Sequence, residues 1–179
     1  MSGENLDTRV AVCPGTYDPV TLGHVDVIER TAKIFDRVIV AVVREPRHKT
    51  VTFGIEDRVA LLEDAVAHLG NVDVDPFSEL VTTFAKRHRA GVIVKGLRAI
   101  SDFEWEFQMN HLNQNLAADI ETLYLMASAH HSFVSSSSVK EIAAFGGCVD
   151  DLVPVTVAER LGALFSNEGQ QAEPPLPPG

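Results

Sequence analysis

The residues best suited to chemistry lie in one connection, which runs from Pro14 to His24 between the first predicted strand and the first predicted helix. Gly15 allows a tight turn or the close approach of a ligand, and Thr16 offers a hydroxyl and an N–H just past the strand. Gly23 and His24 stand where a helix begins, and the amides and positive dipole end of a helix attract anions. An imidazole there can donate a hydrogen bond to a phosphate without a fixed charge. The loop is therefore a candidate phosphate site.

The same loop also has a purely structural interpretation, in which Gly15 and Pro19 are turn residues and His24 is a polar residue at a helix start. The spacing alone does not decide between the two. The loop lacks the G-x-x-x-x-G-K-S/T pattern of Walker A loops and the G-x-G-x-x-G pattern of dinucleotide-binding folds. Both of those classes are excluded.

A second candidate region is the segment 80–101, which contains no acidic residue and carries five cations. Lys95 and Arg98 follow the apolar run 92–94, which places them at the carboxyl end of a strand, and we expect them to contact phosphate. The remaining cations are expected to decorate the end of a helix, where positive charge suits the helix dipole. They are Lys86, Arg87 and Arg89.

The elements that must position these residues alternate along the chain. Five strands are predicted from apolar, largely β-branched runs at 10–13, 38–43, 72–74, 92–94 and 123–126. Six helices are predicted over about 25–35, 55–69, 80–89, 101–117, 135–145 and 156–165. Ser101 is a candidate N-cap, and Ser138 with Glu141 fits a capping box. This order predicts a single α/β domain with a Rossmann-like, doubly wound, five-stranded parallel sheet and helices on both faces.

Composition narrows the choice of ligand. The chain has 179 residues, of which 45% are hydrophobic, and this predicts one globular domain with a substantial core. Its 15 Lys and Arg against 25 Asp and Glu give a net charge of −10, which disfavours nucleic-acid binding through a broad basic face. A small phosphorylated ligand needs only a local cluster of cations and N–H groups, so it fits this composition.

Cellular location and domain bounds are also predicted. Two cysteines fit a reduced, cytosolic protein, because a chain of this length builds a core without disulfides. The first residues lack the cationic start and apolar run of a signal peptide, and no stretch approaches the ~18 apolar residues of a membrane span. We therefore expect a cytoplasmic protein without membrane contact. Pro, Gly and Gln in 166–179 predict a disordered tail after a domain over 1–165.

Four segments, in order, resemble the signatures of one enzyme family. The first runs from Cys13 to His24, and its Thr21-Leu22-Gly23-His24 is similar to the T-x-G-H motif of the nucleotidyltransferase superfamily. The other three are KGLR at 95–98, DFEWEFQ at 102–108 and SFVSSSSVKE at 132–141. Together they resemble the bacterial phosphopantetheine adenylyltransferases over about residues 9–165.

That resemblance implies transfer of AMP from ATP to 4′-phosphopantetheine, with dephospho-coenzyme A and pyrophosphate as products. It also implies a homohexamer, and Mg²⁺ bound through the ATP phosphates, with no metal ligand from the protein. The attacking phosphate is already an anion at neutral pH. Catalysis is therefore expected from positioning and charge stabilisation, without a protein nucleophile.

The resemblance also assigns site residues by motif position. The catalytic set is His24, Lys49 and Arg98. Substrate contacts fall on Thr16, Lys49, Val81 and Lys95. Contacts with ATP fall on Thr16, Tyr17, His24, Gly96, Leu97, Arg98, Glu106, His131, Ser132, Phe133, Val134, Ser135, Ser136 and Ser137.

Three of these positions leave alternatives open. The family places a lysine two residues after the proline of the loop 44–50, whereas this chain has His48 at that spacing and Lys49 one residue later. We favour Lys49. Glu106 either accepts hydrogen bonds from a ribose or supports a neighbouring cation. His131 stands where the family often has Trp or Tyr, and an imidazole can still stack on a base.

Two rival functions are weighed against this one. A sister nucleotidyltransferase would act on nicotinamide mononucleotide or on a phosphorylated alcohol, but those families usually have an arginine where this chain has Lys140. A non-catalytic nucleotide-binding regulator on the same fold is the other rival, since fold alone does not fix function. The intact set of Thr16, His24 and 95–98 argues against it.

Overall fold

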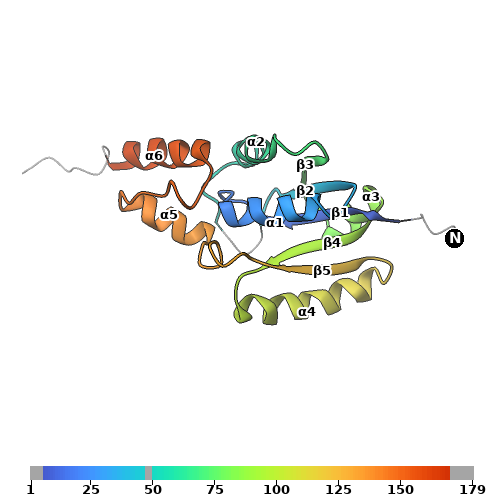
Figure 1. The fold of residues 1–179 in the computed structure, drawn as a ribbon. Helices are drawn as coiled ribbons and strands as arrows, with labels where there is room; N and C mark the ends of the chain where they lie inside the picture. The colour runs from blue at the N-terminus through green and yellow to red at the C-terminus, as the bar shows by residue number, and fades with distance from the viewer. Residues whose placement is uncertain (1–5, 47–49, 170–179) are drawn as a thin grey trace, which may run out of the picture.

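A five-stranded sheet, in which every strand runs parallel to its neighbours, forms the centre of the protein (Figure 1). We describe it from a computed structural model that covers residues 6–46 and 50–169. The order across the sheet is β3-β2-β1-β4-β5, so the direction of winding reverses between β1 and β4. The strands are β1 Asp7–Gly15, β2 Arg37–Val43, β3 Val72–Phe77, β4 Ala90–Leu97 and β5 Glu121–Met126. The predicted fold class is confirmed.

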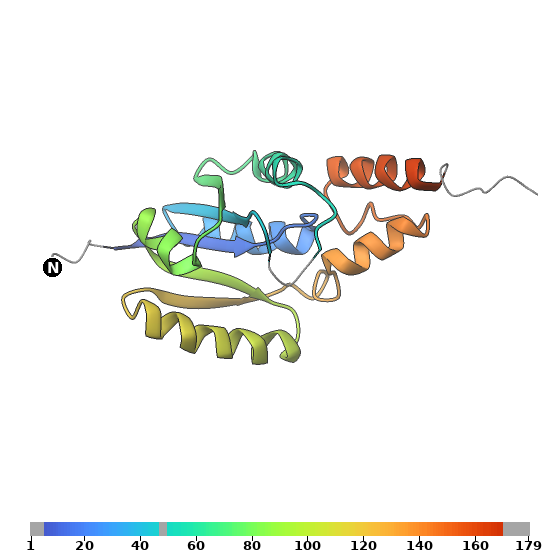
Figure 2. The same cartoon turned by 180° about the vertical axis from the view of Figure 1, so that it is seen from behind.

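Helices cover both faces of the sheet, as Figures 1 and 2 show. Alternate strand residues enter different cores because successive side chains point to opposite faces. Ala11 and Cys13 pack in a core with α1, α2, α5 and α6, whereas Val12 packs on the opposite face with Phe84 of α3. The helices are α1 Leu22–Ala32, α2 Ile55–Val66, α3 Val81–Arg87, α4 Ile100–Leu116, α5 Ser136–Ala144 and α6 Val155–Gly169.

Two predicted helix caps were wrong. Helix α4 begins at Ile100 with Ala99 as its N-cap, so Ser101 lies inside the helix. The Asp102 carboxylate accepts the N–H of Arg98, which precedes the N-cap residue, and no side chain caps this helix. The capping residue of α5 is Ser135, whose side chain accepts the Ser138 N–H. The N-cap therefore lies three residues before Ser138, which stands inside the helix, and the predicted capping box from Ser138 is wrong.

Helix α6 continues to Gly169, four residues beyond the predicted domain boundary at 165. The sequence has no proline between 155 and 173, so nothing forces the helix to stop at 165. The rest of the predicted tail, 170–179, lies outside the described residues, and its disorder stays a prediction. Within the part of the chain that the structure describes, no helix is long and apolar enough to cross a bilayer.

Candidate active site

A cleft of about 400 Å³ opens at the carboxyl ends of β1 and β4, where the strand order reverses. Open parallel sheets bind ligands at this point because loops from opposite directions diverge there. The last residues of both strands line the cleft, together with the starts of α1, α4 and α5. Among the lining residues are Gly15, Tyr17, His24, Lys95, Gly96, Arg98, Glu106, His131, Ser135, Ser136 and Ser137. All of these except Gly15 belong to the predicted set of contact residues.

His24 is fixed by its own helix start. Thr21 is the N-cap of α1, and its Oγ1 accepts the His24 N–H at 3.4 Å. In return the Thr21 N–H donates to His24 Nδ1 at 3.1 Å, which completes a reciprocal capping box. A ring nitrogen that accepts carries no proton, so the neutral imidazole of His24 holds its proton on Nε2. The arrangement makes Nε2 a donor, which suits a phosphate oxygen.

Two glycines permit the close packing behind this histidine. A Cβ on Gly15 would lie 2.7 Å from the ring of Tyr17, which folds back with φ of 50°. A Cβ on Gly96 would lie 2.9 Å from Val27 of α1, so glycine lets β4 approach this helix. Tyr17 is nearly buried, and its hydroxyl donates to the Cys13 carbonyl at 3.0 Å. Tyr17 therefore lines the cleft, and its hydroxyl hydrogen bond holds the loop against the end of β1.

Lys95 projects from the end of β4 and forms an ion pair with Glu106 of α4, with Nζ 2.5 Å from Oε2. Both side chains are about four-fifths buried, at 19% and 21% exposure. Tyr124 of β5 donates its hydroxyl to the Glu106 carbonyl at 3.0 Å. Of the two predicted roles of Glu106, the structure places it beside a cation. It thereby neutralises part of the charge that Lys95 would present to a phosphate.

Arg98 lies at the mouth of the cleft, paired with a carboxylate that the sequence analysis did not single out. Its Nε and Nη2 donate to the two oxygens of Asp102, at 3.0 and 3.2 Å. Its Nη1 donates to the Val134 carbonyl at 3.2 Å. Burial alone would raise the pKa of Asp102, but the hydrogen bonds from Arg98 outweigh it and lower that pKa. The i, i+4 spacing within Arg98-x-x-x-Asp102 was a local signal that could have identified the pair.

The segment before α5 supplies the opposite wall of the cleft. Ser136 Oγ donates to the Pro19 carbonyl at 2.8 Å, so this wall is joined to the loop after β1. His131 lines the cleft, and its Nδ1 is buried without a hydrogen-bond partner among the described residues. A buried ring nitrogen of this kind is costly unless a ligand or water pairs with it. His131 is therefore suited to contact a bound nucleotide.

Several predicted contact residues lie away from this lining. Leu97 is buried away from the lining, whereas Val134, although also buried, is among the residues that line the cleft. Ser132 donates to the Ala129 carbonyl at 3.2 Å. Phe133 is 71% exposed.

Predicted substrate contacts also lie outside the lining. Val81 is the first residue of α3 and packs against the core on the α3 face. The Thr16 carbonyl accepts a hydrogen bond from Arg58 at 2.8 Å. Lys49 and its alternative His48 lie outside the described residues. The ligand roles of all these positions stay predictions.

Sequence reasoning also missed the buried charges that hold the loops of the cleft. Arg58 of α2 is 1% exposed and donates hydrogen bonds to backbone carbonyls of the loop after β1 and of the segment between the end of β2 and α2. Nη1 reaches Thr16 and Val43 at 2.8 Å, Nη2 reaches Arg44 at 2.8 Å, and Nε reaches Phe53 at 3.1 Å. No local pattern distinguishes Arg58 from a solvated helix arginine, because its acceptors come from other segments.

Comparison with known proteins identifies the family. A model of the cytidylyltransferase-like family matches residues 12–142. A phosphopantetheine adenylyltransferase of Caldanaerobacter subterraneus subsp. tengcongensis is 49% identical over 157 residues, which are 88% of this chain and 98% of that protein. One of Synechococcus sp. (strain JA-2-3B'a(2-13)) is 51% identical over 156 residues, 87% of this chain and 98% of that protein. This chain belongs to the phosphopantetheine adenylyltransferase family.

Among solved structures, one from Vibrio parahaemolyticus has the same fold, with a TM-score of 0.63. It is described provisionally as a nicotinate-nucleotide adenylyltransferase, and the match covers 92% of this chain and 96% of that one. At 16% sequence identity the likeness concerns the fold alone. Membership of the phosphopantetheine adenylyltransferase family therefore rests on the sequence relatives, and the doubly wound sheet agrees with it.

Proposed function

We propose that this chain transfers AMP from ATP to the phosphate of 4′-phosphopantetheine, releasing pyrophosphate and forming dephospho-coenzyme A. The observation that carries the proposal is identity of about half the residues with phosphopantetheine adenylyltransferases over nearly their full length. The cleft supports it, since His24, Lys95 and Arg98 line one cavity whose donors suit two phosphorylated ligands.

The chemical step needs little from the protein beyond orientation and charge. An oxygen of the phosphopantetheine phosphate attacks the α-phosphorus of ATP, a new P–O bond forms, and the bond to the β-phosphate bridging oxygen breaks. Pyrophosphate leaves with that electron pair. In the transition state negative charge develops on the oxygens around the α-phosphorus, and the His24 Nε2–H donates a hydrogen bond to them. Lys95 and Arg98 offset the same charge, and no general base is required.

We assign the two ligands to opposite sides of the cleft. Phosphopantetheine takes the side of Thr16, Lys49, Val81 and Lys95. ATP takes the side of the α5 wall, where hydroxyls and N–H groups at a helix start suit an anion. The unpaired Nδ1 of His131 supports placing the nucleotide there. The full ATP set is Thr16, Tyr17, His24, Gly96, Leu97, Arg98, Glu106, His131, Ser132, Phe133, Val134, Ser135, Ser136 and Ser137.

Mg²⁺ is proposed to enter with ATP and to neutralise charge on its phosphates. The carboxylates that line the cleft, Asp102 and Glu106, are each paired with a cation. Among the described residues no three His, Cys, Asp or Glu side chains come together as a metal cage. This donor set fits a metal held mainly by phosphate oxygens and water. Activity should vanish in excess EDTA and return on titration with Mg²⁺.

One incubation tests the function. The purified chain, ATP, Mg²⁺ and 4′-phosphopantetheine should yield dephospho-coenzyme A by mass spectrometry and equimolar pyrophosphate. Parallel reactions replace the acceptor with nicotinamide mononucleotide, nicotinate mononucleotide or glycerol 3-phosphate. Product with one of these and none with phosphopantetheine would assign the chain to a sister activity. ATP binding by calorimetry without any product would favour a regulator.

We further propose that the chain assembles as a homohexamer. Helix α4 and β5 lie together at one side of the sheet in both Figures 1 and 2. Both elements carry exposed large apolar side chains. Such a surface is costly in water and is typical of subunit contacts. Its members are Phe103, Phe107, Leu112, Leu116, Leu123 and Met126. Light scattering after size exclusion should give six times 19.5 kDa, and Phe107→Glu should lower that mass.

A cytoplasmic location is the last part of the proposal. Cys13 and Cys148 are both free thiols, as expected for a protein from a reducing compartment. Cell fractionation with an antibody to the chain should place it with the soluble cytosolic proteins.

A further inference from the structure

One buried carboxylate joins three segments that lie far apart in the sequence. Asp18, in the loop 16–21 after β1, is 5% exposed. Its Oδ1 accepts the Phe53 N–H at 2.8 Å, and its Oδ2 accepts the Thr52 N–H at 2.9 Å and Lys140 Nζ of α5 at 2.6 Å. We call Asp18, Thr52, Phe53 and Lys140 the Asp18 junction.

The junction is rigid for an electrostatic reason. A buried carboxylate is strongly destabilising unless charge and hydrogen bonds compensate it. Here two backbone N–H groups and the Lys140 ammonium provide that compensation, and the Lys140 side chain is itself only 20% exposed. Any shift of α5 relative to the loop 16–21 would leave one charge unpaired. The pair therefore favours one relative position of the two segments.

That position matters because each segment forms a wall of the cleft. The loop 16–21 ends at Thr21, which holds the His24 ring through Nδ1. Helix α5 begins with serines that line the cleft, and Ser136 bonds the carbonyl of Pro19, the residue next to Asp18. Lys140 lies four residues after Ser136, so both side chains project from the same face of α5.

We propose that Asp18 and Lys140 are positioning residues for adenylyl transfer, which set the distance between the His24 side and the α5 side of the cleft. The inference rests on the proposed function for its catalytic consequence. Neither residue lies among those that line the cleft. They act through the placement of groups that do, and misplacing such groups by about 1 Å is enough to cost roughly 10²-fold in rate.

The experiment is a double-mutant cycle on turnover, with Lys140→Met, Asp18→Asn and both together. Each single change should lower kcat about tenfold or more while the KM for ATP changes less than about threefold, because misalignment weakens transition-state more than ground-state contacts. The double variant should be no slower than the slower single variant, since both changes remove one interaction. Lys140→Arg keeps the charge and should recover kcat to within about threefold of the unmodified chain.

Lys86→Met is the matched control, since Lys86 of α3 also pairs with a carboxylate, that of Asp119, but lies outside the cleft lining. It should leave kcat unchanged. Unchanged kcat in Lys140→Met with only a lower melting temperature would reduce the pair to a structural role and overturn the proposal. Additive losses in the double variant would overturn it too, because Lys140 would then act without Asp18. Should Asp18→Asn not fold, Lys140→Met and Lys140→Arg still decide.

Amide hydrogen exchange gives a readout that does not depend on turnover. The Thr52 and Phe53 amides donate to Asp18, so their exchange should accelerate about tenfold or more in Lys140→Met, while amides of α3 keep their rates. Accelerated exchange in a chain that makes no dephospho-coenzyme A would refute the proposed function and leave the junction intact. Normal turnover in the variants of a chain that does make it would refute the junction alone.

Discussion

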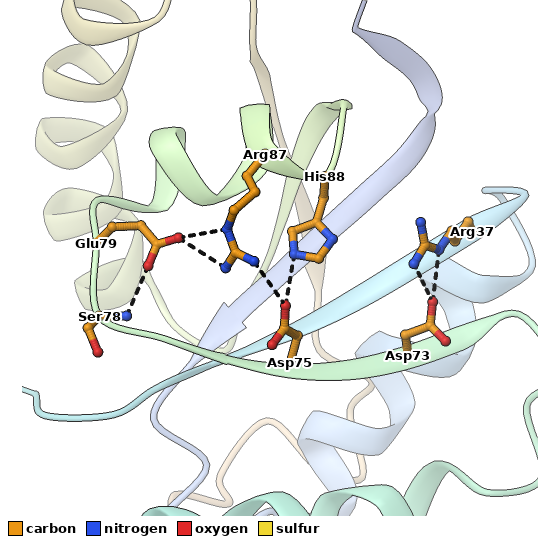
Figure 3. A network of polar contacts seen from close by, with 7 residues as sticks. All are labelled: Arg37, Asp73, Asp75, Ser78, Glu79, Arg87 and His88. Atoms are coloured by element: carbon orange, nitrogen blue, oxygen red, sulfur yellow. Dashed lines mark hydrogen bonds and ion pairs between the residues drawn. The ribbon is translucent and has the colours of Figure 1, made fainter.

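Two charged networks of the protein use the same residue types to different ends. At the cleft, Lys140 and Asp18 are 20% and 5% exposed, and their partners include backbone groups from distant segments. Along the outer edge of the sheet, Arg37 and Asp73 are 51% and 58% exposed. Figure 3 shows this second network, in which Arg87 and His88 lie against Asp75 of β3.

The two networks differ in strength and rigidity because water reaches the charges of one far more than those of the other. Charges that water can reach pair weakly, because screening and side-chain entropy offset most of the attraction. Buried charges cannot separate without large cost, so they fix geometry. The network at β3 covers an edge strand with charge, which discourages pairing with another sheet. The network at the cleft holds loops that carry reacting groups.

The largest effect is expected at Arg58, which donates to the backbone carbonyls of Thr16, Val43, Arg44 and Phe53. Arg58→Met should lower the free energy of unfolding by about 3 kcal/mol or more, since several buried acceptors lose their donor at once. Urea denaturation followed by circular dichroism measures this. A loss below about 1 kcal/mol would mean that water replaces the guanidinium, and the contrast between buried and exposed charge would fail.

Variants of His24 distinguish its role in the reaction from its role in capping the start of α1. His24→Ala should lower kcat about 10²-fold or more, as loss of a transition-state donor does. His24→Asn is the sharper variant, because its Oδ1 can accept the Thr21 N–H in place of Nδ1 while nothing replaces Nε2. We expect it to keep the melting temperature of the unmodified chain and to be equally slow. Near-normal pyrophosphate release by either variant contradicts the assigned role.

Cys13, at the end of β1, makes stability depend on pH. Burial raises the pKa of its thiol from about 9.0 to about 12. The thiol of the unfolded chain ionises at a lower pH than the buried thiol. Its contribution to the stability of the folded state is therefore fully present below pH 9 and is lost as the pH rises toward 12. This thiol alone should lower the free energy of unfolding by about 1 kcal/mol between pH 9 and 10. Cys13→Ala should remove that part of the slope in urea titrations.

The smallest effect is expected on the outer edge. Arg37→Met removes the pair with Asp73 and should change the free energy of unfolding by less than about 0.5 kcal/mol. The difference should shrink further in 1 M NaCl, because salt screens exposed charges. Measured beside Arg58→Met, it compares an exposed arginine paired with a carboxylate with a buried arginine bonded to backbone carbonyls. A loss near that of Arg58→Met would show that exposure does not separate the networks.

The fold was predictable because its signals are local and periodic. Strands buried on both faces, such as 38–43, must be apolar throughout, and amphipathic helices such as α1 must repeat their apolar residues every three to four positions. The glycines and the histidine of the first loop also pointed to the cleft. Caps were less predictable, since neighbouring serines compete for the same helix start, as Ser135 and Ser138 do.

Sequence by itself determined the order of strands and helices along the chain, the family, and the loop after the first strand as a candidate phosphate site. Only the tertiary structure decided which charges compensate each other. Lys140 lies 122 residues from Asp18, and Arg58 lies 42 residues from Thr16. Their pairing depends on burial and on backbone groups brought together by the sheet, and residue type along the chain carries no record of either.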